Sequence, residues 1–278
     1  MQLKPKHRKV AILFSGGPAP SANTVISATT LNFLDNNIPV VGVFRGYEFL
    51  QDFNPHYPKL RKGVHYEELS YNITQVRNDR GIYLRTSRAN PGKNIKTMED
   101  IEDPARNTQL RNILDAFEYL NVGALISIGG DDTLKTANYL SIMGFPVIHI
   151  PKTIDNDYYG IPWTFGYWTA VNTAQTAMLN LKADAQATDS FFIIELMGRK
   201  AGWITYAAGI AAEAILMIAL EDIEEDVLDV EGLAERIADT IIARENNRSP
   251  YWIIAVSEGL ADKLPDNLRP HETDKHGN

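Results

Sequence analysis

Short apolar runs alternate with longer amphipathic segments along most of this chain. The apolar runs predict strands at 10–14, 40–44, 124–128, 147–150, 191–196, 215–220 and 252–256. The amphipathic segments predict helices at 22–34, 110–120, 133–143, 169–182, 201–212 and 233–243. Strands that alternate with helices form parallel sheets covered by helices on both faces. The number of strands favours two such sheets, so the pattern predicts an α/β protein with two Rossmann-like domains whose mostly parallel sheets are flanked by helices.

Composition and charge narrow the class of protein. The chain has 278 residues, of which 44% are hydrophobic and 22% charged, and its net charge is −8. These values are typical of a globular protein, and the negative charge argues against binding to nucleic acid or to an anionic membrane surface. No cysteine is present, which excludes disulfides, thiol catalysis and Cys-ligated zinc. No apolar run approaches the ~20 residues of a membrane-spanning helix. We therefore expect a soluble, cytoplasmic protein without a nucleic-acid or membrane partner.

Two glycine-rich turns each follow a predicted strand and precede a predicted helix. Gly16 and Gly17 come after the strand 10–14, and the sequence GGDDT at 129–133 comes after the strand 124–128. Glycines before a helix N-terminus let backbone amides approach a phosphate, although a tight turn alone also needs glycine. Mg²⁺ commonly binds one or two carboxylates together with substrate phosphate oxygens, which makes Asp131 a candidate ligand. Capping of the following helix is the alternative role for the polar residues of this turn.

The segment PKTIDND at 151–157 combines one lysine, one hydroxyl and two carboxylates. It follows a predicted buried strand, and open α/β sheets bind ligands at the carboxyl ends of their strands. Phosphoryl transfer to an alcohol needs a base near the hydroxyl, a metal on the transferring group and surrounding cations. Asp155 and Asp157 are two residues apart, so in an extended chain they share a side. A turn rich in side-chain caps is the alternative interpretation.

Three charged residues elsewhere are weaker candidates. Arg199 follows the strand 191–196 and can bind a phosphate with two hydrogen bonds, or form a surface ion pair. Glu258 follows the strand 252–256 and can accept hydrogen bonds from sugar hydroxyls, or cap the next helix. Arg88 lies in the irregular stretch 46–108, and such long segments are usually functional or disordered.

Taken together, these motifs resemble those of the phosphofructokinase family. In order along the chain they are SGGPAP after the first strand, TSR ending at residue 88, GGDDT, PKTIDND, MGRKAG and SEG. The resemblance covers nearly the whole chain. Each motif is modest alone, but the ordered set is specific.

Two positions select the phosphoryl donor in this family. ATP-dependent members typically carry glycine where this chain has Asp132 and Lys152, and pyrophosphate-dependent members resemble this sequence at both. A carboxylate at 132 repels the α-phosphate of a nucleotide, and a lysine at 152 suits pyrophosphate, a smaller and denser anion. The resemblance therefore implies Mg²⁺-dependent, reversible transfer between pyrophosphate and fructose 6-phosphate, which gives fructose 1,6-bisphosphate and phosphate. An ATP-dependent 6-phosphofructokinase and a non-catalytic regulatory subunit of the same fold are the alternatives.

The resemblance also implies roles for single residues. Asp155 matches the general base and Asp157 its acidic neighbour, and Arg199 completes the implied catalytic set. The implied pyrophosphate-binding residues are Gly16, Gly17, Arg88, Asp132 and Lys152. Those implied around the sugar phosphate are Thr153, Met197, Gly198, Arg199 and Glu258. Asp131 matches the magnesium-associated carboxylate.

We expect residues 1–165 to form a domain that binds pyrophosphate and Mg²⁺, and residues 166–278 to form a sugar-phosphate domain. Family members continue past the end of this chain into a segment with further basic residues for the sugar phosphate. The polar tail 270–278 has no cap and no apolar periodicity. We therefore expect a chain truncated at its C-terminus, with an incomplete second domain and weak or no activity alone. Exposed apolar faces favour association, so a homo-oligomer is expected.

Overall fold

A computed structural model describes residues 9–246 and 251–269 of the chain. The chain divides into two compact units, Met1–Thr153 and Ile154–Asn278. This boundary lies upstream of the expected one between residues 165 and 166, and the functions expected of the two parts stay predictions. The tail 270–278, which the sequence predicts to be irregular, lies outside the described residues. Within the described ranges, no helix is both long and apolar enough to span a membrane.

Unit 1 contains a five-stranded sheet in the order β3-β2-β1-β4-β5. Its strands are β1 (Lys9–Ser15), β2 (Val40–Val43), β3 (Tyr66–Leu69), β4 (Val122–Gly129) and β5 (Val147–Pro151). Neighbouring strands pair in parallel except β3, which runs antiparallel to β2. The apolar pattern did not predict β3, because its YEEL segment is short and half of it is charged. In the structure only Leu69 of this strand is buried. Mostly parallel pairing, as expected, is confirmed.

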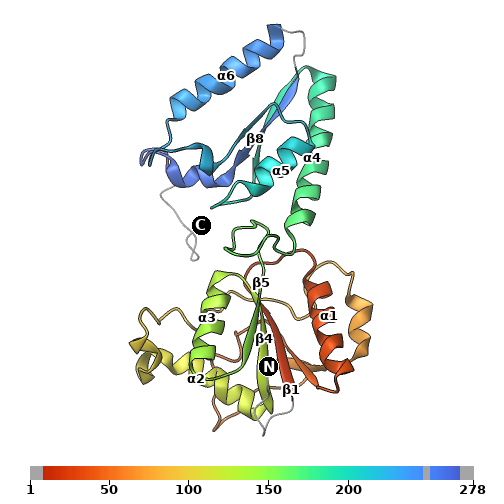
Figure 1. Cartoon of the computed structure of the whole chain (residues 1–278), viewed down its shortest axis with the longest axis vertical. Coiled ribbons are helices and arrows are strands. Elements are labelled where there is room, and N and C mark those ends of the chain that lie inside the picture. Colours follow the sequence, from red (N-terminus) through yellow and green to blue (C-terminus); the bar gives the residue numbers. More distant parts are fainter. Residues whose placement is uncertain (1–8, 247–250, 270–278) are drawn as a thin grey trace. The chain divides into compact units, whose positions relative to one another are not determined.

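Three helices flank this sheet: α1 (Ala22–Asp35), α2 (Pro104–Tyr119) and α3 (Asp131–Ile142). In Figure 1, α1 lies on one side of the sheet, and α2 and α3 lie on the other. Two short 3₁₀ helices, η1 (Tyr71–Val76) and η2 (Glu99–Ile101), interrupt the irregular stretch between β2 and α2. The helix α2 begins earlier than predicted, because Asp103 accepts a hydrogen bond from the Ala105 amide and Pro104 occupies the first turn.

The core of unit 1 is built around β4, which is buried along its whole length. Buried parallel strands are nearly continuous apolar runs, and VGALISIG has that character. Leu125 of β4 packs in one cluster with Leu110 and Phe117 of α2. Phe117 also stacks on Phe145, with ring centroids 5.1 Å apart. This packing encloses the central strand β4 in the core.

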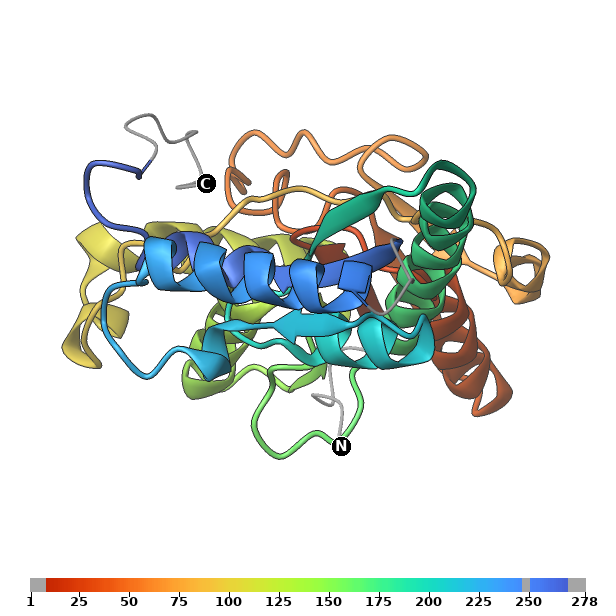
Figure 2. The same cartoon turned by 90° about the horizontal axis from the view of Figure 1, so that it is seen from above.

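Unit 2 contains a three-stranded parallel sheet in the order β6-β8-β7. Its strands are β6 (Phe191–Leu196), β7 (Leu216–Ile218) and β8 (Trp252–Ser257). The helices α4 (Tyr167–Thr188) and α5 (Trp203–Ala211) pack on one face of the sheet, and α6 (Val230–Asn246) packs on the other (Figure 1, Figure 2). Two 3₁₀ helices, η3 (Leu220–Asp222) and η4 (Glu258–Lys263), follow β7 and β8. The expected α/β architecture with helix-flanked sheets is therefore confirmed.

The register of each sheet aligns the strand ends that carry the predicted motifs. In unit 1, Ser15 pairs with Gly129, and Gly129 pairs with Pro151. In unit 2, Leu196 pairs with Ser257. The residues that follow these strands therefore emerge side by side at one edge of each sheet.

Replacing Leu125 with alanine tests the assignment of β4 as the centre of the core. Leu125 is fully buried, and Leu→Ala changes at such sites cost about 2–5 kcal/mol in free energy of unfolding. Urea unfolding followed by circular dichroism measures this cost. The matched control is Leu134→Ala on α3, where the side chain is 37% exposed and the expected change is within about 0.5 kcal/mol. Equal costs for the two variants would contradict the core assignment.

Candidate functional site

The first glycine turn leaves β1 and is held by a segment distant in sequence. Gly16 has φ 88°, a left-handed conformation that glycine adopts without strain. Its amide donates to the Ser87 carbonyl at 2.8 Å, and the Thr86 hydroxyl donates to the Gly16 carbonyl at 2.6 Å. The irregular segment before Arg88 therefore fastens this turn at the edge of the sheet.

The second glycine turn leaves β4 and lies against the first. A Cβ atom at Gly129 would stand 2.5 Å from Thr133 Oγ1, so only glycine allows this approach of strand and helix. A Cβ atom at Gly16 would lie 3.8 Å from the Gly130 nitrogen. Gly130 is the N-cap of α3, and the N-terminus of a helix carries partial positive charge. The two turns and this helix end can together approach an anion.

Lys152 connects the two turns. Its side chain is buried, with 8% exposure, and its Nζ donates to the Gly17 carbonyl at 2.7 Å. The same Nζ lies 6.0 Å from the centre of the Phe14 ring. The backbone amide of Lys152 donates to the Gly129 carbonyl at 2.9 Å. Lys152 is therefore held to both turns, to the first by its largely buried ammonium group and to the second by its backbone amide.

Asp131 and Asp132 form the first turn of α3, and both are exposed. The Asp132 carboxylate lies 3.8 Å from Lys135 Nζ, with both side chains well exposed, so this ion pair is weak. In the described part of the chain, no three His, Cys, Asp or Glu side chains gather as metal ligands. A single carboxylate such as Asp131 suits Mg²⁺ held mainly by phosphate oxygens and water, because Mg²⁺ rarely uses an all-protein cage.

Arg88 is far from the two glycine turns in sequence, and the hydrogen bond between Gly16 and Ser87 brings its segment to the same edge. Arg88 is exposed and directly follows Ser87, whose carbonyl accepts from Gly16 and whose hydroxyl donates to the Arg45 carbonyl at 2.6 Å. Gly16, Gly17, Arg88, Asp131, Asp132 and Lys152 are therefore all carried by segments at this edge of unit 1. Thr153, the last residue of unit 1, directly follows Lys152.

The TIDND segment continues into unit 2 as a turn. Asn156, between the two candidate carboxylates, has φ 56° and is 7% exposed. Its side chain donates to the Pro162 carbonyl at 3.1 Å and accepts from the Thr164 amide at 2.9 Å. Because the left-handed Asn156 lies between Asp155 and Asp157, the segment is not regularly extended and takes the turn that the sequence left open as its alternative. The sequence offered a turn rich in side-chain caps as one interpretation, but it did not predict that Asn156 makes these hydrogen bonds.

At the edge of unit 2, the MGR and SEG motifs meet. The Gly198 amide donates to Glu258 Oε1 at 3.0 Å, and the Ser257 hydroxyl donates to the Gly198 carbonyl at 2.6 Å. Gly198 has φ 130°, and a Cβ atom there would lie 2.5 Å from the Ala201 carbonyl oxygen, so glycine is required. Met197, just before this turn, is 58% exposed.

Arg199 forms a two-point ion pair with Asp262 of η4. The contacts are Nε to Oδ2 at 3.0 Å and Nη2 to Oδ1 at 3.2 Å, with both side chains about half exposed. The Asp262 carboxylate raises the pKa of the Arg199 guanidinium. A surface ion pair was one of the two sequence interpretations of Arg199, but its partner was not predicted. Asp262 carries no motif signal, since only the pairing of β6 with β8 brings η4 to this arginine.

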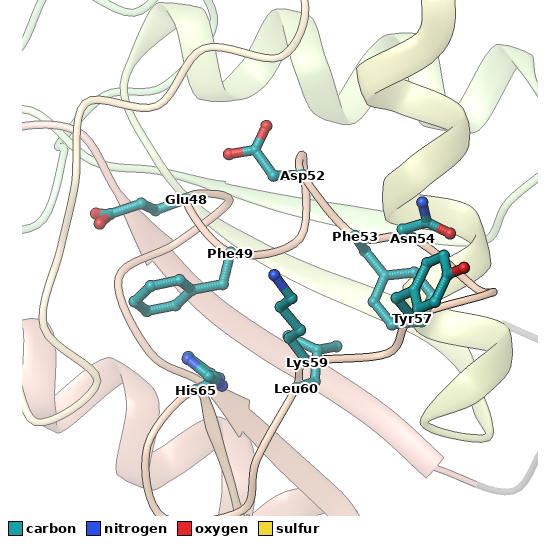
Figure 3. Close-up of a pocket in the computed structure, with 9 residues that line it drawn as sticks. All are labelled: Glu48, Phe49, Asp52, Phe53, Asn54, Tyr57, Lys59, Leu60 and His65. Carbon is teal, nitrogen blue, oxygen red and sulfur yellow. The ribbon is translucent and has the colours of Figure 1, made fainter.

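A separate pocket of about 590 Å³ lies in the segment between β2 and β3 (Figure 3). Its lining residues are Glu48, Phe49, Asp52, Phe53, Asn54, Tyr57, Lys59, Leu60 and His65. The Phe49 and His65 rings meet edge to face, with centroids 4.4 Å apart. None of the residues predicted from the sequence lines this pocket. It is therefore distinct from the glycine turns, and its size alone assigns it no role.

Comparisons with known proteins identify the family of this chain. Residues 9–275 match the model of the family described as phosphofructokinase. The chain is 31% identical to a pyrophosphate–fructose 6-phosphate 1-phosphotransferase of Thermotoga maritima, over 94% of this chain and 59% of the relative. It is 29% identical to an ATP-dependent 6-phosphofructokinase of Bacteroides thetaiotaomicron, over 91% of this chain and 68% of the relative.

The solved structure of phosphofructokinase from Saccharomyces cerevisiae is similar with a TM-score of 0.72 and 23% identity. That similarity covers 93% of this chain and 34% of the yeast chain, and it concerns the fold alone. The chain spans 59% of the length of the Thermotoga relative, which is less than two thirds. Because the family model matches nearly the whole sequence, this chain belongs to the phosphofructokinase family.

Proposed function

We propose that this chain carries the catalytic machinery of a pyrophosphate-dependent phosphofructokinase. The reaction would be reversible transfer of a phosphoryl group from pyrophosphate to the 1-hydroxyl of fructose 6-phosphate, giving fructose 1,6-bisphosphate and phosphate. The observation that carries the proposal is the placement of Lys152, whose ammonium is buried and held at 2.7 Å from the Gly17 carbonyl. A buried charge interacts more strongly with an anion than an exposed one, because water screens it less.

The first turn of α3 supports the choice of donor. Asp132 is exposed there, and the family resemblance implies that its carboxylate would meet and repel the α-phosphate of a nucleotide. Pyrophosphate has no third phosphate group and avoids this repulsion. The relatives alone do not decide the donor, because pyrophosphate-dependent and ATP-dependent names occur at similar identities. ATP-dependent phosphofructokinase is therefore the second candidate.

The remaining residues follow the roles that the family resemblance implies. The backbone at Gly16 and Gly17 would hold donor phosphates, with Arg88 and Lys152 as the cations. Asp155 would take the proton of the sugar hydroxyl, with Asp157 as its acidic neighbour. Thr153, Met197, Gly198, Arg199 and Glu258 would hold the sugar phosphate. For Arg199 this requires the guanidinium to leave Asp262 or to share its donors with the phosphate.

Asp131 would hold Mg²⁺ together with pyrophosphate oxygens. When bound, the ion would neutralise charge on the transferring phosphoryl group. The substrates are then two small anions. The cytoplasmic location and the homo-oligomeric state expected from the sequence stay predictions.

The choice of donor is tested by a direct exchange of substrates. With Mg²⁺ and fructose 6-phosphate, the protein is expected to turn over pyrophosphate and to use ATP poorly. Asp132→Gly removes the repelling carboxylate and is expected to raise kcat/KM for ATP about tenfold, equivalent to ~1.4 kcal/mol. Lys135→Met is the control, since it removes the ion-pair partner of Asp132 but keeps the carboxylate. A wild-type preference for ATP would show that the donor assignment is wrong.

The base is tested by Asp155→Asn, which keeps the shape of the side chain but cannot accept the hydroxyl proton. General-base catalysis contributes about 10²–10⁴-fold, so kcat is expected to fall by that factor while the KM values change little. Steady-state kinetics with both substrates measure the effect. The control is Asp266→Asn, whose carboxylate is 96% exposed in the same unit, and its kcat should match the wild type. An Asp155→Asn enzyme that keeps most of its kcat would exclude this role.

Mg²⁺ binding is tested by calorimetry with and without pyrophosphate. Because one carboxylate is a poor site for Mg²⁺, binding to the protein alone is expected to be weak and to tighten when pyrophosphate is present. Asp131→Asn should weaken the binding seen with pyrophosphate, whereas Asp35→Asn on α1 should not. Tight Mg²⁺ binding to the protein alone would contradict the shared site.

A further inference from the structure

A chain of hydrogen bonds runs beneath the second glycine turn. Tyr47 Oη lies 3.2 Å from Ser127 Oγ, and Ser127 Oγ lies 3.3 Å from His149 Nδ1. His149 Nε2 in turn lies 3.1 Å from the carbonyl oxygen of Gly129. Tyr47 and Ser127 are fully buried. The chain therefore links a buried tyrosine to the peptide group that begins the turn.

The chemistry of the groups fixes the direction of this chain. The Gly129 carbonyl can only accept, so His149 Nε2 must carry a proton and donate it. In a neutral ring Nδ1 is then an acceptor, and the Ser127 hydroxyl donates to it. The Ser127 oxygen accepts from the Tyr47 hydroxyl. Each member of the chain has a partner in this arrangement.

The electrostatic surroundings support a neutral ring. Burial lowers the pKa of His149 to about 4, and the hydrogen bond to Gly129 and the charge of Asp131 offset this only in part. Burial also raises the pKa of the Tyr47 hydroxyl, which therefore keeps its proton. The hydrogen-bonded groups from Tyr47 to the Gly129 carbonyl are therefore uncharged near neutral pH.

The Gly129 carbonyl belongs to the same peptide group as the Gly130 amide. In a trans peptide the C=O and N–H bonds point in opposite directions, and none of the described peptides is cis. The carbonyl is held toward β5 by His149 Nε2 and by the Lys152 amide at 2.9 Å. The Gly130 N–H must therefore point away from β5, and its nitrogen lies beside Gly16 of the first turn.

We propose that His149 is a positioning residue, which fixes the Gly129–Gly130 peptide through its Nε2–H and so orients the amide of the donor-phosphate turn. The identity of the donor, pyrophosphate, rests on the proposed function, but the hydrogen-bond chain does not. His149 is half-buried and the other side chains of β5 are apolar, so a hydrocarbon side chain at 149 would serve packing alone. The orientation of this peptide explains why an imidazole is present instead.

Two substitutions at His149 separate positioning from packing. His149→Leu keeps similar bulk and loses the donor, whereas His149→Gln keeps an N–H close to the Nε2 position. Loss of one net hydrogen bond predicts that KM for pyrophosphate rises about 3- to 10-fold in His149→Leu. In His149→Gln it should stay close to the wild type. KM for fructose 6-phosphate should not change in either variant.

Asn107→Leu is the matched control for stability. Asn107 is fully buried in unit 1 and donates to the Ile101 carbonyl at 2.7 Å, away from the glycine turns. Its replacement should lower the melting temperature without changing KM for pyrophosphate. If KM for pyrophosphate follows the melting temperature across all three variants, His149 acts on stability only and the proposal fails.

Nuclear magnetic resonance tests the same chain without any turnover. With ¹⁵N-labelled histidine, the signals lost in His149→Gln identify the ring, and the wild type should show the neutral Nε2–H tautomer at pH 7. Hydrogen exchange of the Lys152 amide, which shares the Gly129 carbonyl, should be faster in His149→Leu than in His149→Gln. An Nδ1–H tautomer or equal exchange in the two variants would overturn the proposal. If the wild type does not use pyrophosphate, the proposed function fails, and tautomer and exchange still decide the role of His149.

Discussion

The parallel register of β1, β4 and β5 is the constraint on which the candidate donor site depends. It makes Ser15, Gly129 and Pro151 neighbours, although they are far apart in sequence. Every candidate donor residue of unit 1 either follows one of these strand ends or is fastened to one. A slip of one residue in this pairing would turn each strand's side chains to the opposite face, so the buried core also protects the site. Packing and chemistry are therefore satisfied by the same register.

The elements built from buried apolar runs could be predicted from the sequence. All seven predicted strands and six predicted helices occur, with ends shifted by more than two residues at α2, α4 and α6, and a shorter β7. Two of the errors, at β3 and α2, share one cause, which is that the deciding signal was not hydrophobic. The strand β3 is half polar and pairs as an antiparallel edge. The start of α2 depends on the Asp103 cap, which lies before the first apolar residue of its helical pattern.

The site was predictable as a set of motifs but not as a set of contacts. Glycines before helices and carboxylates after strands can be recognised from the sequence, since each motif consists of residues that are adjacent in the chain. The contact of Arg199 with Asp262, the anchoring of the TIDND turn by Asn156, and the link from Tyr47 to His149 are not. The Arg199–Asp262 pair and the link from Tyr47 to His149 join segments that only the fold brings together. In the TIDND turn, Asn156 takes a left-handed conformation, which a regular extended segment does not contain.

The electrostatics of the chain explain why local anchoring of cations matters. With a net charge of −8, the protein as a whole repels small anions. Attraction must therefore come from groups that keep their position and are shielded from solvent. Lys152 meets both conditions, because its ammonium is held by the Gly17 carbonyl and its exposure is small. Its backbone amide and the His149 ring meet at the Gly129 carbonyl, so the cation and the orientation of the neighbouring turn depend on one peptide group. A rigid cation beside oriented amides favours a compact, highly charged anion over a long, flexible one, since a compact anion can contact all of them at once.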